Sequence, residues 1–260
     1  MLTLYHARTS VCAVKIRIAL AEKALPWEGK VLTLRGDQFD PAYTRLNPNA
    51  VVPTLVHDDK VIIESSVILY YLDDAFPRPP LMPPAAYDRS LVYMTSKLLD
   101  ERVHTACATL TFATVNRAPM LAMGKEALAA EIAKIPDEKR RITRRQVAEM
   151  GLDAPPVVDA LGTYAKLLDR IEQAASRGPY LAGRNYSLAD IGATPYVWRL
   201  EQLRLARMWD QRPGVAAWYE RMRERPSFEA AITSVLTQED RDRYARFEPD
   251  PWPKVQSILA

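Results

Sequence analysis

Two segments of the sequence place reactive or anion-binding side chains at the start of a predicted helix. In the first, Thr9 and Ser10 precede a run over residues 11–25 whose apolar residues recur every three or four positions, and Cys12 falls in its first turn. The spacing predicts an amphipathic helix, with Lys15 and Arg17 on its polar faces. A helix N-terminus presents unpaired N–H groups and a positive dipole end, so a hydroxyl there can cap the helix. A thiol at the same place ionises more readily. Ser10 is therefore a candidate cap or anion-binding group, and Cys12 a candidate nucleophile or a small buried side chain.

The second segment is Glu64-Ser65-Ser66, directly before a predicted helix over Val67 to Phe76. Ser65 or Ser66 is expected to cap this helix. The hydroxyl and backbone N–H of Ser65 also suit a carboxylate, because capping and anion binding use the same N–H groups. Glu64 is either the partner of an ammonium group or a solvated charge.

The elements that must position these residues read as a small α/β domain. A strand, a helix ended by Pro26 and a second strand buried on both faces predict a parallel βαβ unit. Two further strands joined by a tight turn, followed by the second helix, complete a mixed sheet. The predicted strands are Leu2–Tyr5, Val31–Leu34, Val52–Val56 and Val61–Ile63.

The rest of the chain reads as helix after a proline-rich connector over residues 76–84, which is the expected domain boundary. Ser187-Leu188-Ala189-Asp190 has the pattern of a capping box, in which the side chains of Ser187 and Asp190 each accept a hydrogen bond from the backbone N–H of the other residue. Further helices are predicted at Tyr87–Asn116, Lys125–Ile135, Asp137–Met150, Pro156–Ala175, Leu188–Leu203, Val215–Arg225 and Ser227–Val235.

Composition excludes several classes of protein. The 260 residues carry 35 basic and 32 acidic side chains, a balance that favours neither a nucleic-acid nor a membrane partner. Cys12 and Cys107 are too few for a disulfide framework, and His6, His57 and His104 are too scattered to indicate a metal site. No signal peptide and no apolar run long enough for a transmembrane helix is seen, so a cytoplasmic location is expected.

Several motifs in order along the chain resemble the cytosolic glutathione transferases. They are LTLYHA, the helix-opening Ser10, EKALPWE, LNPNAVVPTL, ESS followed by VILYYLDDAFP, and YSLADI. The resemblance implies a thioredoxin-like α/β domain at residues 1–78, a linker at 79–87 and an all-helical domain at 88–260. It implies glutathione as cosubstrate, a hydrophobic acceptor site between the domains, a homodimer, and no need for a metal.

The resemblance also implies roles for individual residues. Ser10 falls on the catalytic serine or cysteine position and would donate a hydrogen bond to the glutathione thiolate. Val52-Pro53 resembles the cis-proline turn of the family, which aims the Val52 backbone at the cysteinyl backbone of glutathione. Glu64 and Ser65 would hold the γ-glutamyl end, while Gln38 would contact the glycine end.

Rival assignments remain open. Thr9 could replace Ser10, and Tyr5 lies where some related transferases place a catalytic tyrosine, although packing on the sheet is its simpler role. A nucleophilic Cys12 would redirect the chemistry to thiol–disulfide exchange and deglutathionylation. A binding or scaffold protein that keeps the fold without catalysis is a further alternative.

The acceptor substrate is not readable from the sequence. The extra helical region around residues 134–156 loosely resembles bacterial glutathione-dependent β-aryl-ether-cleaving enzymes and their dehalogenating relatives, which suggests an aryl-ether or halogenated aromatic electrophile. Leu98, Arg102 and Thr105 are candidate acceptor-site residues. The basic run Lys139 to Arg145 reads as a solvated, ion-paired helix face rather than a phosphate site.

Overall fold

The computed structural model describes residues 1–135 and 137–260. Its four-stranded sheet has the order β2-β1-β3-β4, with β1 parallel to β2 and antiparallel to β3, and β3 antiparallel to β4. The predicted βαβ and ββα units are thus confirmed. The strands are β1 Leu2–His6, β2 Trp27–Val31, β3 Thr54–His57 and β4 Lys60–Ile63.

The prediction for β2 was wrong in both position and burial. The strand ends at Val31, and four of its five residues are exposed because it forms an edge of the sheet. The stretch predicted as strand leaves the ladder where the Asp37 carboxylate accepts hydrogen bonds from the backbone N–H groups of Thr33 (2.6 Å) and Leu34 (2.9 Å). A local carboxylate therefore replaces the sheet partner that these N–H groups needed.

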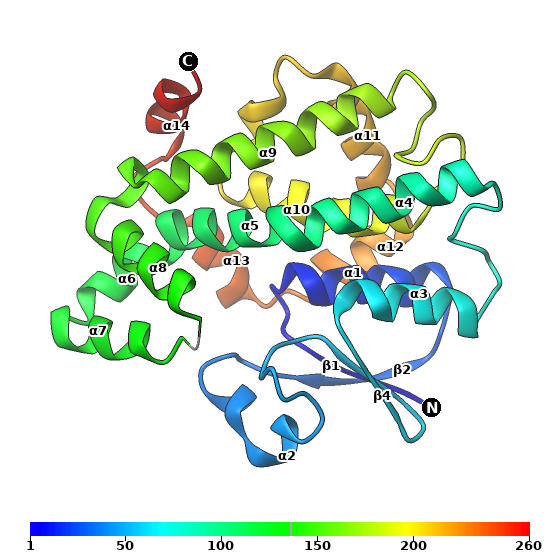
Figure 1. Ribbon diagram of the computed structural model, residues 1–260, viewed down its shortest axis with the longest axis horizontal. Coiled ribbons are helices and arrows are strands. Elements are labelled where there is room, and N and C mark those ends of the chain that lie inside the picture. Colours follow the sequence, from blue (N-terminus) through cyan, green and yellow to red (C-terminus); the bar gives the residue numbers. More distant parts are fainter. Residues whose placement is uncertain (136) are drawn as a thin grey trace. The chain divides into compact units, whose positions relative to one another are not determined.

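Helices α1 (Val11–Glu22) and α3 (Ser65–Ala75) lie side by side on one face of the sheet, as Figure 1 shows. The prediction of an amphipathic α1 was wrong, because the helix is enclosed by α3 on one side and by α12 (Pro226–Phe228) and η6 (Glu229–Thr233) on another. Even Lys15 and Arg17 are each only 1% exposed. These two cations must find partners inside the protein.

A loop with two short helices, η1 (Asp37–Phe39) and α2 (Pro41–Thr44), connects β2 to β3. Tyr43 of α2 packs in a small apolar cluster with Ala7, Leu32 and Val52. The cluster joins the loop after β1 to the turn before β3.

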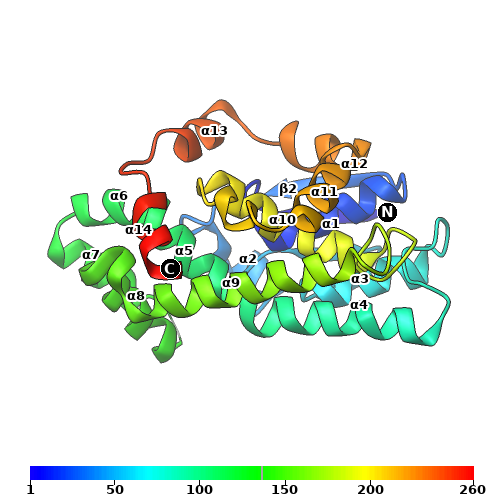
Figure 2. The same cartoon turned by 90° about the horizontal axis from the view of Figure 1, so that it is seen from above.

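The remaining elements are helical, and the predicted helices are confirmed with small shifts at their ends. The segment predicted at Tyr87–Asn116 contains two π-type turns, η2 and η3, and the helices α6, α13 and α14 were not predicted. In Figures 1 and 2, α6, α7 and α8 lie together beyond the end of α5. The bounds are α4 Ala86–Leu98, η2 Leu99–Val103, α5 His104–Thr111, η3 Phe112–Asn116, α6 Arg117–Ala122, α7 Lys125–Ala133, α8 Glu138–Met150, η4 Gly151–Asp153, α9 Pro155–Ala174, α10 Leu188–Gln202, η5 Ala206–Trp209, α11 Pro213–Arg223, α13 Gln238–Ala245 and α14 Trp252–Leu259.

The chain divides into two compact units that interleave along the sequence. Unit 1 comprises Met1–Lys97, Ala174–Pro195 and Ala217–Gln238, and unit 2 comprises Leu98–Gln173, Tyr196–Ala216 and Glu239–Ala260. The sheet and all of the predicted glutathione-binding residues belong to unit 1.

The capping box predicted at the start of α10 forms in part and belongs to a larger buried network in unit 1. Asp190 accepts from the Ser187 N–H as predicted, but Ser187 Oγ accepts from the N–H of Ala189 (3.3 Å) rather than from that of Asp190. The Asp190 carboxylate accepts from the backbone N–H and the hydroxyl of Ser187, both at 3.0 Å. It also accepts from the Leu181 N–H and the Trp218 indole N–H, both at 2.9 Å. Four donors thus satisfy one fully buried carboxylate, which ties the 180–190 loop to two helices.

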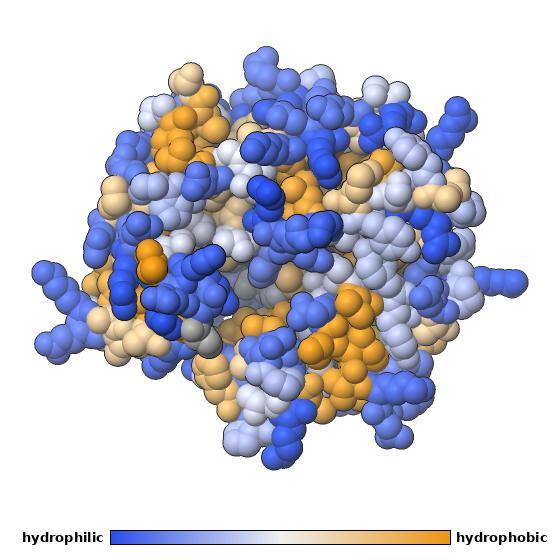
Figure 3. Space-filling model, viewed as in Figure 1, coloured by the Kyte–Doolittle hydropathy of each residue, from blue (hydrophilic) through white to orange (hydrophobic). Residues whose placement is uncertain are grey.

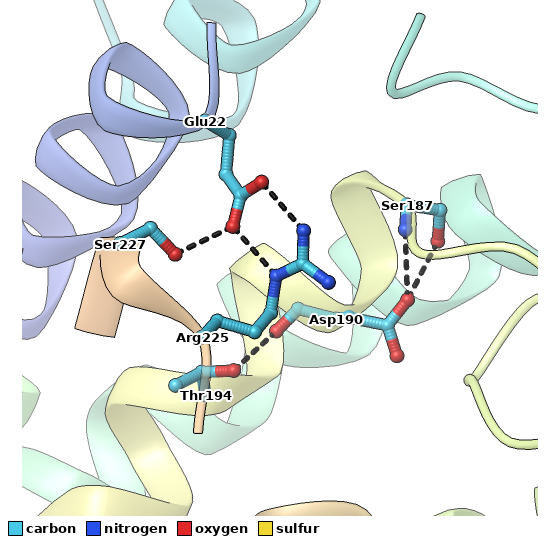
Figure 4. Close-up of polar contacts among 6 residues, drawn as sticks. All are labelled: Glu22, Ser187, Asp190, Thr194, Arg225 and Ser227. Carbon is cyan, nitrogen blue, oxygen red and sulfur yellow. Dashed lines mark hydrogen bonds and ion pairs between the residues drawn. The ribbon is translucent and has the colours of Figure 1, made fainter. Parts of the chain in front are cut away.

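A second polar cluster in unit 1 lies beside this one in Figure 4. The guanidinium of Arg225 donates two 2.6 Å hydrogen bonds to the carboxylate of Glu22, at the end of α1. Ser227 donates a further bond to Glu22. This bidentate pair holds the segment that leads into α12 against α1.

Candidate active site at one end of the sheet

Strand register brings the predicted site segments to the same end of the sheet. His6 of β1 pairs with Val31 of the parallel strand β2, so the loop that carries Ser10 and the loop that carries Gln38 begin together. Tyr5 pairs with Thr54 at the start of β3, and Thr54 pairs with Ile63 at the end of β4. The Val52-Pro53 turn and the Glu64-Ser65 turn therefore open at that end as well.

Ser10 is the N-cap of α1. Its Oγ accepts from the backbone N–H of Ala13 at 3.3 Å, and the side chain is half-buried. Because the oxygen acts as an acceptor in the cap, the hydroxyl hydrogen is left to donate to an anion placed at the helix start. The capping and thiolate-binding roles are compatible.

The loop before Ser10 is held by Arg17, whose importance the sequence reasoning missed. The guanidinium donates to the carbonyl oxygens of Ala7 (3.2 Å), Arg8 (2.7 Å) and Ala231 (2.8 Å). It also contacts Nδ1 of His6 at 3.2 Å, and since Arg can only donate, Nδ1 must be the acceptor. Arg17 thereby fixes the path of the chain into α1.

Burial lowers the pKa values of both Arg17 and His6. The pKa of Arg17 falls to about 10. Burial, together with the nearby charges of Arg17 and Arg8, lowers the pKa of His6 to about 4. His6 is therefore neutral at physiological pH, which is the state that can accept from Arg17.

Val52 and Pro53 are joined by a cis peptide bond, as the resemblance implied. The turn is braced by Tyr43, whose hydroxyl donates to the Val51 carbonyl at 2.5 Å and contacts Thr54 Oγ1 at 2.9 Å. Asn47 Nδ2 donates to the same carbonyl and the same hydroxyl. Within the described part of the chain, the Val52 backbone N–H and C=O make no hydrogen bond, so they are available to a peptide ligand.

The Glu64-Ser65 turn differs from its prediction. Neither Ser65 nor Ser66 is the N-cap of α3: Glu64 occupies that position without a side-chain cap, and Ser65 is the first helical residue. Glu64 has a φ of +66°, a conformation that costs a non-glycine residue free energy and is concentrated at functional sites. The positive φ turns the chain sharply into α3.

Lys15 supplies a cation at this helix start. Its Nζ donates to Ser65 Oγ at 3.3 Å, and both residues are buried. A positive dipole end and an ammonium group side by side favour an anion at the first turn of α3. A signal for Lys15 is present in the sequence, because the residues one, three and four positions away from it on either side are all apolar.

The other predicted residues have plainer surroundings. Gln38 is half-buried, and its Oε1 accepts from the Gly36 N–H at 3.0 Å. The ring of Tyr5 packs against Tyr43, with ring centroids 5.4 Å apart. Cys12 is half-buried in the first turn of α1 and is not in a disulfide.

The described residues contain no group of three or more His, Cys, Asp or Glu side chains arranged to hold a metal ion. They also contain no helix that is both long and apolar enough to cross a membrane.

Comparison with known proteins identifies the family. Residues 4–80 match the model of the N-terminal domain of glutathione S-transferases, and residues 99–221 match that of the C-terminal domain. The chain is 32% identical over 243 residues to the tetrachloro-p-hydroquinone reductive dehalogenase of Sphingobium chlorophenolicum, covering 88% of this chain and 94% of that protein. The chain belongs to the glutathione S-transferase superfamily.

Other members of this superfamily of glutathione-dependent enzymes are similar in sequence or structure. The crystal structure of the β-etherase LigF from Sphingobium sp. strain SYK-6 superposes with a TM-score of 0.77 at 26% identity, covering 90% of this chain and 99% of that one. Glutathione S-transferase Z1 of Arabidopsis thaliana is 42% identical over 99 residues, 38% of this chain and 45% of the plant protein. The predicted resemblance and the predicted fold are confirmed.

Proposed function

We propose that this superfamily member is a transferase that stabilises the glutathione thiolate with Ser10. The thiolate attacks an electrophilic carbon of an apolar cosubstrate, a C–S bond forms, and the leaving group departs with its bonding electron pair. Residues 1–78 supply the glutathione site and residues 88–260 the acceptor site.

One observation carries the proposal: three segments suited to different parts of glutathione open at the same end of one sheet. Ser10 offers a hydroxyl donor at a helix start, which suits a thiolate. The free backbone groups of Val52 suit pairing with the cysteinyl residue in the manner of an added strand.

The third segment suits the γ-glutamyl end, which carries a carboxylate and an ammonium group. The first turn of α3, with Ser65 and the Lys15 ammonium, suits the carboxylate, and the exposed Glu64 carboxylate suits the ammonium. Gln38 is assigned to the glycine end. The chemistry of the donors present therefore fits the tripeptide.

The class of the second substrate is inferred from the relatives. One is named for reductive dehalogenation of a chlorinated hydroquinone and another for cleavage of an ether. We assign this protein an aromatic electrophile that carries a halide or aryl-ether leaving group. Arg102 and Thr105 are exposed on helical segments and Leu98 is half-buried, and they are proposed as acceptor-site residues.

The test compares the wild-type protein with Ser10→Ala and Ser10→Thr. Isothermal titration calorimetry measures glutathione binding, and conjugation of chlorodinitrobenzene measures transfer. We expect Ser10→Ala to keep most of the affinity and to lose about 100-fold in kcat, as when one donor to a developing anion is removed. Ser10→Thr, which keeps the hydroxyl, should retain activity. A wild-type protein that binds no glutathione would instead support the scaffold alternative.

A second candidate activity runs through Cys12, and the reductive chemistry named for the 32% identical relative favours weighing it. The Cys12 thiolate would attack the glutathionyl sulfur of a mixed disulfide, forming a Cys12–glutathione disulfide and releasing the other thiolate. A glutathione thiolate would then form glutathione disulfide and restore Cys12. Cys12→Ser should abolish deglutathionylation of a model mixed disulfide while sparing conjugation. If Cys12→Ser keeps deglutathionylation and only Ser10→Ala loses both activities, this role for Cys12 is excluded.

We also propose a homodimer formed through an apolar face of unit 1. Large apolar side chains of β4, α3 and α4 remain exposed there, from 42% for Val61 to 66% for Tyr87. Tyr70 of α3 and Tyr93 of α4 pack edge to face and make the two helices one surface. Exposed apolar patches of this kind mark interaction surfaces.

A further inference from the structure

Unit 2 contains a cavity formed by α6, α7 and α8 that the proposed function does not use. Its volume is about 610 Å³, which is within the size range of small-molecule sites. The side chains that line it are mostly aliphatic, and they include Leu121, Leu128, Ala129, Ile132 and Ala148. An apolar body of moderate size would be removed from water there.

The charges around this cavity are predominantly positive. Arg117, Lys125 and Arg145 line it together with a single acid, Glu149. Arg117 is anchored, since its Nε donates to the carbonyls of Val147 (3.2 Å) and Ala148 (3.0 Å) near the end of α8. Lys125 and Arg145 make no ion pair or side-chain hydrogen bond within the part of the chain that the structure describes. Two cationic groups are thus available beside an aliphatic surface.

The helix that supplies Arg145 adds further positive charge. The sequence predicts an ion-paired face for the run Lys139 to Arg145, but the Asp137 carboxylate caps α8 by accepting from the Arg140 N–H at 2.7 Å. Arg144 lies 3.9 Å over the ring of Phe112 rather than on a carboxylate. Figure 3 shows apolar side chains among strongly hydrophilic ones over α7 and α8. The local excess of positive charge is complementary to an anion.

From this cavity we infer a binding site for a small amphipathic organic anion. Its carboxylate pairs with Lys125 and Arg145, and its aliphatic body lies on Leu128, Ala129 and Ile132. A free medium-chain carboxylate matches this arrangement, because the charges border a hollow lined by apolar groups. The surface of a bilayer would instead require a flat basic face.

The experiment titrates the full-length protein with a fluorescent fatty-acid analogue, dansyl-aminoundecanoate, whose emission rises in an apolar site. Decanoate and decanol compete as a charged and an uncharged ligand of equal chain length. Lys125→Gln/Arg145→Gln removes both cations, and Lys139→Gln/Arg140→Gln removes the same charge from exposed positions that do not line the cavity. Ala129→Trp fills the apolar surface.

We expect decanoate to displace the probe from the wild-type protein and from Lys139→Gln/Arg140→Gln with equal affinity. Lys125→Gln/Arg145→Gln should weaken decanoate about tenfold or more, the loss typical of hydrogen bonds to a charged group. Ala129→Trp should bind neither probe nor decanoate while its melting temperature stays unchanged. Decanol should compete poorly.

Five results would overturn the inference, and four of them concern the probe, decanoate and vesicles directly. They are no binding by the wild-type protein, equal weakening in both charge variants, equal competition by decanol, and binding only to anionic phosphatidylglycerol vesicles. Displacement of the probe by S-hexylglutathione would also place it in the catalytic site instead. The outcome does not depend on the proposed transferase activity, which is measured separately by conjugation.

Discussion

The ammonium nitrogen of Lys15 lies 3.3 Å from the hydroxyl oxygen of Ser65, which joins the middle of α1 to the first turn of α3. Lys15 lies in the helix that Ser10 caps, so one rigid element carries both the cation proposed for one end of glutathione and the hydroxyl proposed for its thiol. A substrate held at both groups has its sulfur positioned by binding energy from its distant carboxylate.

Replacing Lys15 with Met is expected to raise the KM for glutathione about tenfold or more with little change in kcat, because it removes a charged partner of the γ-glutamyl carboxylate. Lys15→Arg should recover part of the affinity. An apolar side chain of similar length should not lower the melting temperature. The specific control is a glutathione analogue without the γ-glutamyl carboxylate, for which wild type and Lys15→Met should have the same KM. A difference that persists with this analogue would refute the assignment.

Tyr43→Phe removes the hydroxyl that braces the Val52-Pro53 turn from its contacts with Val51 and Thr54. Burial raises the pKa of Tyr43, so the wild-type side chain is a neutral donor. Its loss should cost about 1–2 kcal/mol of stability and raise the KM for glutathione. Tyr5→Phe is the matched control, since the Tyr5 ring packs on Tyr43. A large fall in kcat for Tyr5→Phe would identify Tyr5 as the catalytic hydroxyl.

The buried pair His6 and Arg17 predicts a loss of stability in acid. The pKa of His6 is about 4 in the folded protein, below its ordinary value of 6.5, so the unfolded chain binds more protons between these values. Stability from this group is complete above pH 6.5 and decreases as the pH falls toward 4, by about 3 kcal/mol in total. Urea unfolding of the wild type and His6→Asn at pH 7 and pH 4.5 would measure it. The variant keeps an acceptor for Arg17 and should show a much flatter dependence; equal slopes would contradict the assignment.

Asp190→Ala is expected to be among the most destabilising single changes in unit 1. It leaves the buried donors of Leu181, Ser187 and Trp218 without their acceptor, at a cost of about 3 kcal/mol or more. Thr194→Val removes only a hydroxyl that donates to the Asp190 carbonyl and should cost about 1 kcal/mol. Equilibrium unfolding of both variants tests the contrast. Similar losses would mean that the carboxylate is not the centre of the network.

The proposed dimer face predicts that Met94→Glu, at a residue 46% exposed on α4, shifts the protein from dimer to monomer. Sedimentation velocity at several concentrations reports the change directly. Ile142→Glu, at a residue of α8 that is also 46% exposed, is a matched control that should leave the dimer intact. A monomeric wild-type protein would refute the dimer.

Local chemistry in the sequence determined a large part of this protein. Ser10 caps α1, the Asp190 carboxylate accepts from the Ser187 N–H at the start of α10, and β1 pairs with β2 and β3 as the order of elements predicts. Each of these features depends on residues close in sequence or on simple rules of chain connection, so a pattern of side chains is enough to indicate it. The family resemblance rested on the same kind of evidence, namely short motifs in a particular order.

Tertiary structure decided the features that depend on what surrounds a residue. Lys15 and Arg17 read as polar residues of an amphipathic helix, but α1 is covered on several sides, so both cations turn inward to Ser65 and to the backbone of the loop before Ser10. The same applies to Asp37, which captures the backbone of a predicted strand. Burial depends on how all of the elements pack together. The sequence alone therefore does not show which charged side chains are enclosed and need partners inside the protein.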